Sequence, residues 1–421
     1  MPYIMSGIGG GLKGRRTNPE IVKFTIAVLS GEKTHKEIEE YVRQHTFDRR
    51  ITFVINNSCN LSCRHCYLQV ESLTAQALDA QEWDKVFRSA LRQNPDLVCL
   101  CGKEIFLGNA GADALVRLTE LKRSLAVDTR IGAITNGTLL HRHQAFVEQA
   151  DLDYLDISFD GGKEAHDKLR GEGSFAKASV NAKWAVATLG RRLFAGLTVQ
   201  RENFQSMRAA VTEITGLGIQ TIGCGFYQKV PYSDESLALS DAEFDQFFQS
   251  LGDLADIQLH QPTTLLFDIY STSLGVCLAF MRSRWFAPDR FLTDERGEVF
   301  NEHLLPNGLR LQFSFIPYPM TIFKSARITP EGNYLAAEDT LDTRFYPDRT
   351  LGNVRDFDFD LDRLHEHARN HPRVSRIFAD HSENILPQIQ EAFAIHTMLA
   401  RSPKQVSIPA VSHERTQLSI A

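Results

Sequence analysis

The chain has 421 residues, of which 43% are hydrophobic and 23% are charged, the balance of an ordinary globular protein. With 46 Lys and Arg against 52 Asp and Glu, its net charge of −6 argues against a general nucleic-acid or anionic-membrane binder. No apolar run approaches the about 18 residues of a membrane span, and no signal-peptide core opens the chain. We therefore expect a soluble, cytoplasmic protein.

The cysteines are the most specific feature of the sequence. There are seven of them, an odd number that does not suit a disulfide framework, and three follow the pattern C-x3-C-x2-C: Cys59, Cys63 and Cys66. A structural zinc would want a fourth ligand with its own spacing partner, for which the adjacent His65 is poorly placed. Iron–sulfur clusters are held by thiolates, and three ligands for four irons leave one iron open. The pattern favours a reactive cluster, with zinc and free core cysteines as alternatives.

Runs typical of β-strands alternate with helical periodicity over roughly residues 50–230. The six runs are Ile51–Ile55, Leu97–Cys101, Arg130–Ile134, Tyr154–Phe159, Phe194–Val199 and Gln220–Phe226. Helical spacing lies between them, for example over Gln81–Gln93 and Glu164–Leu189. Strands that alternate with helices imply βα units and a parallel sheet, so we predict an α/β fold.

The cysteine motif after a strand resembles the cluster loop of the radical S-adenosylmethionine (SAM) superfamily, with His65 in a position often taken by an aromatic residue. The six βα units are similar to that family's partial (βα)6 TIM-like barrel. The resemblance implies one [4Fe–4S] cluster on the three cysteines, SAM as the second cofactor and a flavodoxin- or ferredoxin-type reductant. In the family, the reduced cluster cleaves SAM to a 5′-deoxyadenosyl radical, which abstracts hydrogen from a substrate carbon.

Two strand ends resemble SAM-binding segments of the family. After the second strand, Gly102, Lys103 and Glu104 are similar to the G-G-E-P segment that holds the amino group of SAM. Lys103 replaces the second glycine, and Ile105 replaces the proline. After the third strand, the turn that contains Asn136 is also similar to the family. The resemblance implies that these residues, together with His65, bind the cofactor.

The fourth strand separates apolar from polar side chains. Its period of two places one set toward the covering helices and the other toward the barrel interior: Leu155, Ile157 and Phe159 against Asp156, Ser158 and Asp160. By resemblance, Ser158 and Asp160 contact SAM, and Arg170 suits its methionine carboxylate as a forked donor. Asn203, four residues past the fifth strand, is a further SAM candidate. As alternatives, these residues are a capping hydroxyl, a turn, a surface charge and an ordinary loop amide.

The remaining cysteines are interpreted mostly as core residues, because free cysteine is among the most buried residue types. Cys224 shares the outward face of its strand, Cys99 shares a face with Leu97, and Cys277 lies in an apolar helical run. Cys101 ends the second strand beside the SAM-binding segment. It is therefore the best candidate for a catalytic thiol that donates hydrogen to a substrate radical, with Cys277 second; that both are core residues is the alternative.

The N-terminal segment predicts two short helices. Ile21–Leu29 has helical spacing, and Thr34-x-x-Glu37 is a capping box that opens the second helix. The pair resembles part of the winged-helix peptide-recognition element of peptide-modifying enzymes. The alternative is a helical hairpin that plugs one end of the barrel.

The region after residue 230 predicts a hairpin with a Pro330-Glu331-Gly332 turn. Its spacing resembles the SPASM/twitch-type accessory domain of radical SAM enzymes, but no cysteine follows Cys277 to hold an auxiliary cluster. We expect four parts: an N-terminal arm and helical element, the radical SAM barrel, an α+β accessory domain and a flexible tail, at 1–49, 50–235, 236–401 and 402–421.

Three functions are compatible with this sequence. The first is radical modification of a ribosomal precursor peptide in natural-product biosynthesis, by a crosslink, epimerisation or rearrangement. The second is a radical SAM dehydrogenase, epimerase or mutase that acts on a small molecule such as an amino acid or sugar. The third, a non-catalytic sensor that carries a cluster, is disfavoured by the SAM-like strand ends. We expect neither nucleic acid nor a membrane as a partner.

Overall fold

The computed structural model describes residues 18–45, 50–66, 76–229, 234–270, 273–293, 299–317, 326–336 and 350–401. The predicted tail 402–421 and most of the predicted N-terminal arm lie outside these stretches. Within them, no helix is both long and apolar enough to cross a membrane.

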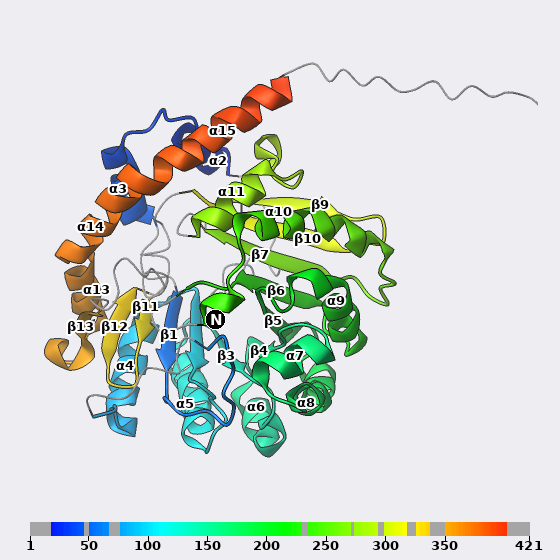
Figure 1. Cartoon of the computed structure of the whole chain (residues 1–421). Coiled ribbons are helices and arrows are strands. Elements are labelled where there is room, and N and C mark those ends of the chain that lie inside the picture. Colours follow the sequence, from blue (N-terminus) through cyan, green and yellow to red (C-terminus); the bar gives the residue numbers. More distant parts are fainter. Residues whose placement is uncertain are drawn as a thin grey trace, which may run out of the picture.

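The described strands form one 13-stranded sheet (Figure 1). They are β1 (Arg50–Val54), β2 (Leu97–Cys101), β3 (Arg130–Thr135), β4 (Tyr154–Ser158), β5 (Leu193–Val199), β6 (Thr221–Phe226), β7 (Thr264–Tyr270), β8 (Leu292–Thr293), β9 (Val299–Leu304), β10 (Arg310–Ile316), β11 (Ala326–Ile328), β12 (Asn333–Ala336) and β13 (Thr350–Asn353). Strands β1 to β7 are consecutive neighbours and all parallel. The first six agree with the predicted strands to within one residue at each end, which confirms the α/β prediction.

Helices surround the curved sheet. They are α2 (Pro19–Leu29), α3 (His35–His45), α4 (Ala80–Arg92), α5 (Ala110–Leu125), α6 (Gln144–Ala150), α7 (Lys163–Arg170), α8 (Ser174–Leu189), α9 (Met207–Gly216), α10 (Asp241–Ser250), α11 (Leu274–Arg282), α13 (Leu361–Arg369), α14 (Pro372–Asp380) and α15 (Leu386–Arg401). Figure 1 shows α4, α5, α6, α8 and α9 on the convex side of the sheet. The helical segment predicted over 164–189 consists of two helices, because Gly171 and Gly173, with φ of +110° and +76°, separate α7 from α8.

Successive strand residues face two different environments, as the alternation of polar and apolar residues predicts. Toward the helices, one set joins the main apolar core: Leu155, Ile157 and Phe159. On the concave face, a separate small apolar cluster forms from Leu97, Cys99, Tyr154 and Phe194. The polar set of β4 and the turn after it is buried as well: Asp156, Ser158 and Asp160. The concave face therefore combines an apolar floor with buried polar groups above it.

The chain after residue 235 extends both edges of the same sheet. At one edge β10 pairs in parallel with β7 and is followed by the antiparallel β9 and β8. At the other edge β11 pairs in parallel with β1, and β12 and β13 follow antiparallel. The predicted hairpin is β11–β12, whose turn contains Gly332 at φ +86°. This part of the chain therefore shares one sheet with the barrel strands.

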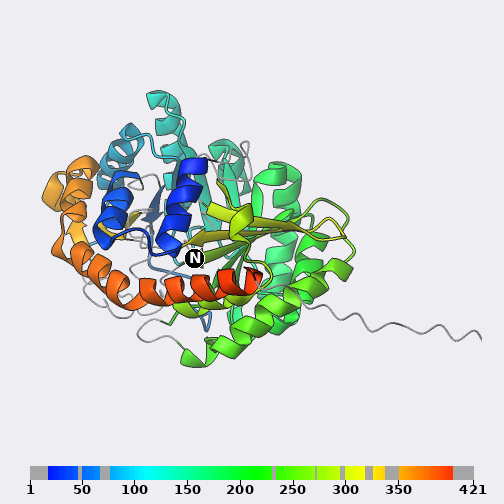
Figure 2. The same ribbon diagram turned by 90° about the horizontal axis from the view of Figure 1, so that it is seen from above.

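The two N-terminal helices, α2 and α3, pack against the C-terminal helices (Figure 2). The Gln390 side chain of α15 donates a hydrogen bond to the Val28 carbonyl at 2.9 Å. Arg43 of α3 donates to the Arg369 carbonyl at 2.6 Å and lies 5.5 Å from the Phe378 ring centroid. The helix pair is therefore anchored to the C-terminal part of the chain, on the outside of the sheet.

Candidate active site

The cysteine motif lies on the loop that follows β1. Cys63 is buried, whereas Cys59 and Cys66 are half-buried. Burial raises the pKa of the Cys63 thiol to about 11, and the positive charge of Arg170 opposes this effect. The backbone N–H of Leu61 donates to the Cys59 sulfur at 3.3 Å. Thiolates at these positions therefore need a positive partner, which iron would supply.

The donor set fits an iron–sulfur cluster. The three thiols are close enough that Cys59 and Cys66 each raise the pKa of Cys63, and hydrogen bonds to sulfur are a usual means of tuning such clusters. In the described stretches, no group of three or more His, Cys, Asp or Glu could hold a single metal ion. Three cysteines that ligate separate irons of one cluster do not need to converge on one ion. Cys59, Cys63 and Cys66 would hold the cluster.

The loop after β2 lies alongside the cysteine loop. The backbone N–H of Lys103 donates to the Asn56 carbonyl at 3.3 Å, and that of Glu104 donates to the Ser58 carbonyl at 3.0 Å. Asn56 returns a side-chain hydrogen bond to the Glu104 carbonyl at 2.9 Å. A side chain at Gly102 would come within 2.7 Å of the Asn56 amide oxygen, so this close approach requires glycine.

The Glu104 carboxylate connects two strand ends. It is 1% exposed and accepts hydrogen bonds from the Thr135 hydroxyl at 2.6 Å and from the backbone N–H groups of Asn136 and Phe106, at 2.7 and 3.0 Å. Burial raises its pKa, and these three donors oppose the rise. The carboxylate thereby fixes the β3 turn relative to the β2 loop.

Asn136 extends this network to the cysteines. Its side-chain amide donates to the Cys59 sulfur at 3.7 Å and to the Asn60 side-chain oxygen at 3.0 Å. Its own oxygen accepts from the backbone and hydroxyl of Thr138, at 2.9 and 2.6 Å. The β3 turn, one of the predicted SAM-binding segments, therefore contacts a predicted cluster ligand directly.

Asp160 is the centre of a second network. Its carboxylate accepts from the Arg170 Nε at 2.5 Å, the His65 Nε2 at 3.1 Å and the backbone N–H of Thr198 at 2.9 Å. Burial acts to raise its pKa, but Arg170 and His65 outweigh burial and hold the pKa at about 2. Burial lowers the pKa of His65 to about 4, so its imidazole is neutral at pH 7. Asn203 donates to the Asp160 carbonyl at 3.2 Å.

The structure thus gathers the predicted site residues around the cysteine loop in two groups. One group lies near Cys59, and the other includes His65, Asp160, Arg170 and Asn203. Ser158 is buried on the concave face between Asp156 and Asp160. Sequence reasoning missed Asn56 and the fully buried Gln200, whose side-chain amide has no hydrogen-bond partner among the described residues. No motif marks either position, although Gln200 follows β5 on the concave face.

The other cysteines occupy different surroundings. Cys101 is half-buried at the end of β2. Cys277 lies fully buried in the main apolar core, where burial raises its pKa to about 12. Cys224 also belongs to that core, as predicted for the outward face of its strand, and burial raises its pKa. Among these three thiols, Cys101 is the least buried.

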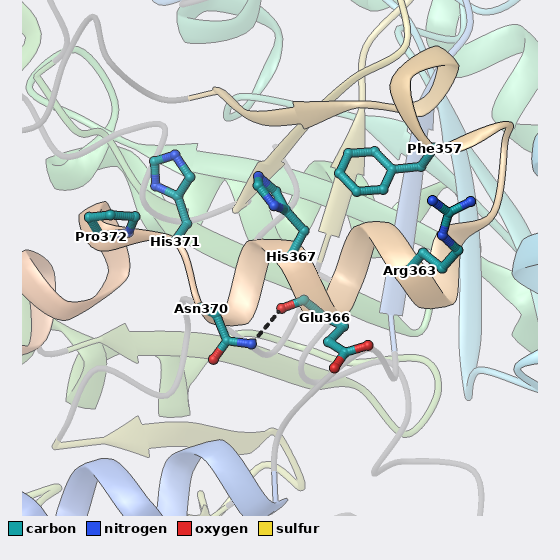
Figure 3. A pocket seen from close by; sticks show the side chains of 7 residues that line it. All are labelled: Phe357, Arg363, Glu366, His367, Asn370, His371 and Pro372. Atoms are coloured by element: carbon teal, nitrogen blue, oxygen red, sulfur yellow. Dashed lines mark hydrogen bonds between the residues drawn. The ribbon is translucent and has the colours of Figure 1, made fainter.

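A pocket of about 400 Å³ lies away from the cysteine loop, on α13 and the turns beside it (Figure 3). It is lined by Phe357, Arg363, Glu366, His367, Asn370, His371 and Pro372. The centroid of the His367 ring lies 5.1 Å from that of Phe357 and 6.0 Å from that of His371. None of the predicted cluster or SAM residues lines this pocket.

Comparison with known proteins identifies the domain. Residues 53–211 match the profile of the Radical SAM superfamily. The chain therefore contains a radical SAM domain, the catalytic unit of enzymes that use SAM and an iron–sulfur cluster, which confirms the predicted family and the prediction that the chain is an enzyme.

Similar proteins include two curated relatives and one solved structure. Fe-coproporphyrin III synthase from Methanosarcina barkeri is 25% identical over 179 residues, covering 41% of this chain and 43% of that protein. The sporulation killing factor maturation protein SkfB from Bacillus subtilis is 22% identical over 199 residues, covering 47% of each. The chain thus spans less than half the length of either curated relative.

The solved structure is SuiB from Streptococcus suis, which has a TM-score of 0.55 at 15% identity and covers 78% of this chain and 67% of that one. SuiB has also been crystallised bound to the precursor peptide SuiA. At this identity the likeness establishes the fold, a partial barrel with accessory elements.

Proposed function

We propose that this chain is a single-cluster radical SAM enzyme that modifies a ribosomally made precursor peptide by a crosslink, an epimerisation or a rearrangement. The observation that carries the proposal is the pair of hydrogen-bond networks that join the C-x3-C-x2-C loop to the ends of β2, β3 and β4. The peptide substrate is supported by SkfB, which is named a maturation protein, and by the SuiB complex with a precursor peptide.

Two groups of residues would hold the cofactors. Cys59, Cys63 and Cys66 hold the cluster, which together with SAM supplies a 5′-deoxyadenosyl radical when both are bound. Asp160 orients the guanidinium of Arg170 through their 2.5 Å contact, so that Arg170 meets the methionine carboxylate of SAM.

The remaining cofactor contacts are assigned by position. By resemblance, segment 102–104 would bind the amino group of SAM, and Asn136, Ser158, Asn203 and His65 would make further contacts with it. The barrel positions the substrate carbon and excludes water and competing hydrogen donors. A flavodoxin- or ferredoxin-type protein in the cytoplasm supplies the electron.

The cysteine inventory supports the proposal of a single cluster. Outside the motif the chain has Cys99, Cys101, Cys224 and Cys277, which lack the spacing of cluster ligands. Without an auxiliary cluster, an outcome that returns hydrogen to the substrate or rearranges its bonds needs no further electron acceptor. Cys101 would be the thiol that returns the hydrogen atom, and the thiyl radical left on it would be restored by one electron from the same reductant and one proton.

The first experiment separates peptide from small-molecule substrates. Anaerobically reconstituted enzyme is incubated with SAM, dithionite and a precursor peptide encoded beside its gene, and the peptide mass and 5′-deoxyadenosine are measured. We expect a modified peptide and about one 5′-deoxyadenosine per turnover if SAM is consumed.

A second candidate is a small-molecule reaction, which the similarity to Fe-coproporphyrin III synthase favours. Under that alternative, the peptide neither binds nor changes mass, whereas SAM cleavage is accelerated by a metabolite. Formation of 5′-deoxyadenosine without any peptide binding at micromolar concentrations would therefore reject the peptide proposal while leaving the radical SAM chemistry intact.

A further inference from the structure

One buried carboxyl group on the concave face is not used by the cofactor networks. Asp156 is 0% exposed, in the middle of β4, and neither oxygen has a hydrogen-bond partner of ordinary geometry among the described residues. Burial raises its pKa to about 7, while the backbone amide of Gly196 acts to lower it. Since a buried polar group without a partner is costly, its presence calls for an explanation.

Among the described residues that act on the pKa of Asp156, the positively charged one is Arg170. Below the carboxyl group lies the small cluster that contains Cys99 and Tyr154, and Asp156 raises the pKa values of both. In the layer above, Arg170 lowers the pKa of Asp156 and Asp160 raises it, but that arginine is already paired with Asp160. A cation that entered this layer would therefore meet a carboxylate whose charge is not neutralised by a direct contact.

The neighbouring strands carry apolar side chains beside Asp156 and glycine one step above it. Asp156 pairs with Ile134 of β3 and Phe194 of β5, which flank the carboxyl group on the concave face. The convex positions of β5 and β6 carry apolar core residues, so their alternate residues Gly196, Gly223 and Gly225 face the concave side. These glycines are adjacent in the sheet, since Ser158 pairs with Gly196 and Gly196 pairs with Gly223. Glycine in a strand interior often marks a place where a ligand approaches the backbone closely.

The depth of the carboxyl group selects long substrate groups. Asp156 lies two residues below Ser158 along the strand, a distance of about 7 Å. A group that reaches Asp156 from the level of the SAM-binding residues must therefore be extended and narrow. A lysine or arginine side chain has that shape, carries the opposite charge and satisfies a carboxylate with several donors.

We infer that Asp156 and the glycine-lined wall one step above it form a subsite that takes a cationic side chain of the substrate, an alkylammonium or alkylguanidinium group. The inference rests on the proposed function, because it places the cation within the substrate of the radical reaction. It predicts that the modified peptide carries lysine or arginine at or next to the reacting residue.

The test uses the reconstituted holoenzyme with SAM and two matched small probes, n-pentylammonium and the uncharged 1-pentanol, in a ligand-observed NMR titration. We expect pentylammonium to bind and pentanol not to, and Asp156→Asn to weaken pentylammonium about tenfold or more, the loss of one charge-assisted contact. The control Asp289→Asn removes an exposed carboxylate and leaves binding unchanged. Iron content shows that each variant folds.

Each remaining outcome decides between the claims. Equal binding of both probes, no binding of either, or an unchanged affinity in Asp156→Asn rejects the subsite. Two short peptides that differ only by lysine or norleucine extend the test. If pentylammonium binding depends on Asp156 but neither peptide binds, the cation subsite stands and the peptide substrate fails. Absence of 5′-deoxyadenosine in the same samples instead rejects the radical SAM proposal.

Discussion

Two buried carboxyl groups on one face of the same strand and turn behave in opposite ways. Asp160 accepts hydrogen bonds from Arg170, His65 and Thr198, and its pKa is held at about 2. Asp156 is equally buried but has no such partners, and its pKa is raised to about 7. Because both carboxyl groups are buried, burial does not distinguish them. The hydrogen-bond donors around Asp160 are what keep that group ionised. Asp160, the upper carboxylate, belongs to the cofactor networks. Asp156, the lower carboxyl group, is the one that we propose binds a ligand.

The largest effect is expected from removing the three cysteines of the loop that contacts the upper carboxylate, Asp160, through His65. Replacement of Cys59, Cys63 and Cys66 by Ala should abolish iron binding, from about four irons per chain to none, and with it all 5′-deoxyadenosine formation. Iron and sulfide analysis after anaerobic reconstitution measures this. Cys224→Ala, in the apolar core, is the matched control and should keep its iron. About eight irons in the wild type, or a cluster that survives the triple change, contradicts the single-cluster proposal.

The next largest effect is expected from removing the cationic partner of the upper carboxylate, Asp160, so that it lacks a donor as Asp156 does. Arg170→Ala leaves Asp160 without its cation, and breaking a buried ion pair costs about 3–5 kcal/mol of stability. SAM binding should also weaken about tenfold or more. Thermal unfolding and SAM titration measure the two effects.

Arg192→Ala is the control for this change, because its ion pair with Asp151 is exposed and worth at most about 1 kcal/mol. Unchanged SAM affinity in Arg170→Ala would show that Arg170 only orders Asp160.

The stability contributed by Asp160 depends on pH. Because the pKa of Asp160 is lowered, its stabilisation is present above about pH 4 and is lost as the pH falls toward 2.

The lower carboxyl group should show the reverse pH dependence. Because its folded-state pKa is raised to about 7, Asp156 favours the folded state least when ionised, and its penalty grows as pH rises from about 4 to 7. Asp156→Asn should therefore raise stability by about 1–4 kcal/mol at pH 8 and by much less at pH 4. Thermal unfolding at both pH values measures the difference. A variant that is less stable at pH 8 contradicts the assignment of an unpartnered carboxyl group.

Sequence reasoning predicted much of this site but not the contrast between its carboxyl groups. The alternation of residues correctly placed Asp156 and Asp160 on one buried face, because period two depends only on backbone geometry. It could not separate them, since their difference comes from Arg170 and His65, which approach from other segments. The pairing of Asp160 with Arg170 needs the turn into α7, which no local pattern encodes.

The difference between local patterns and contacts between segments also explains which other predictions agree with the structure and which do not. The strands were predicted closely, because each is a short apolar run with clear ends. Helical periodicity over 164–189 did not mark the break between α7 and α8, because it persists across Gly171 and Gly173 although their backbone ends the first helix. The contact of Asn56 with Gly102 joins residues 46 positions apart in the sequence, so it depends on how β1 and β2 pair. Spacing within a segment is readable from the sequence, whereas contacts between segments are not.

The smallest effect is expected at Cys101, which ends β2, with β3 between it and the strand of Asp156. If this thiol returns hydrogen to the substrate radical, wild-type product formed in deuterated water carries deuterium at carbon, because a thiol hydrogen exchanges with solvent. Cys101→Ala should lose that label while the rate of 5′-deoxyadenosine formation changes by less than about twofold, since the thiol acts after hydrogen abstraction. Mass spectrometry of the product measures both.

Cys277→Ala, in the apolar core, is the comparison variant. Loss of the label in that variant instead would make Cys277 the donor. A wild-type product without solvent deuterium at carbon excludes thiol donation altogether, and the reaction is then a rearrangement or a net oxidation.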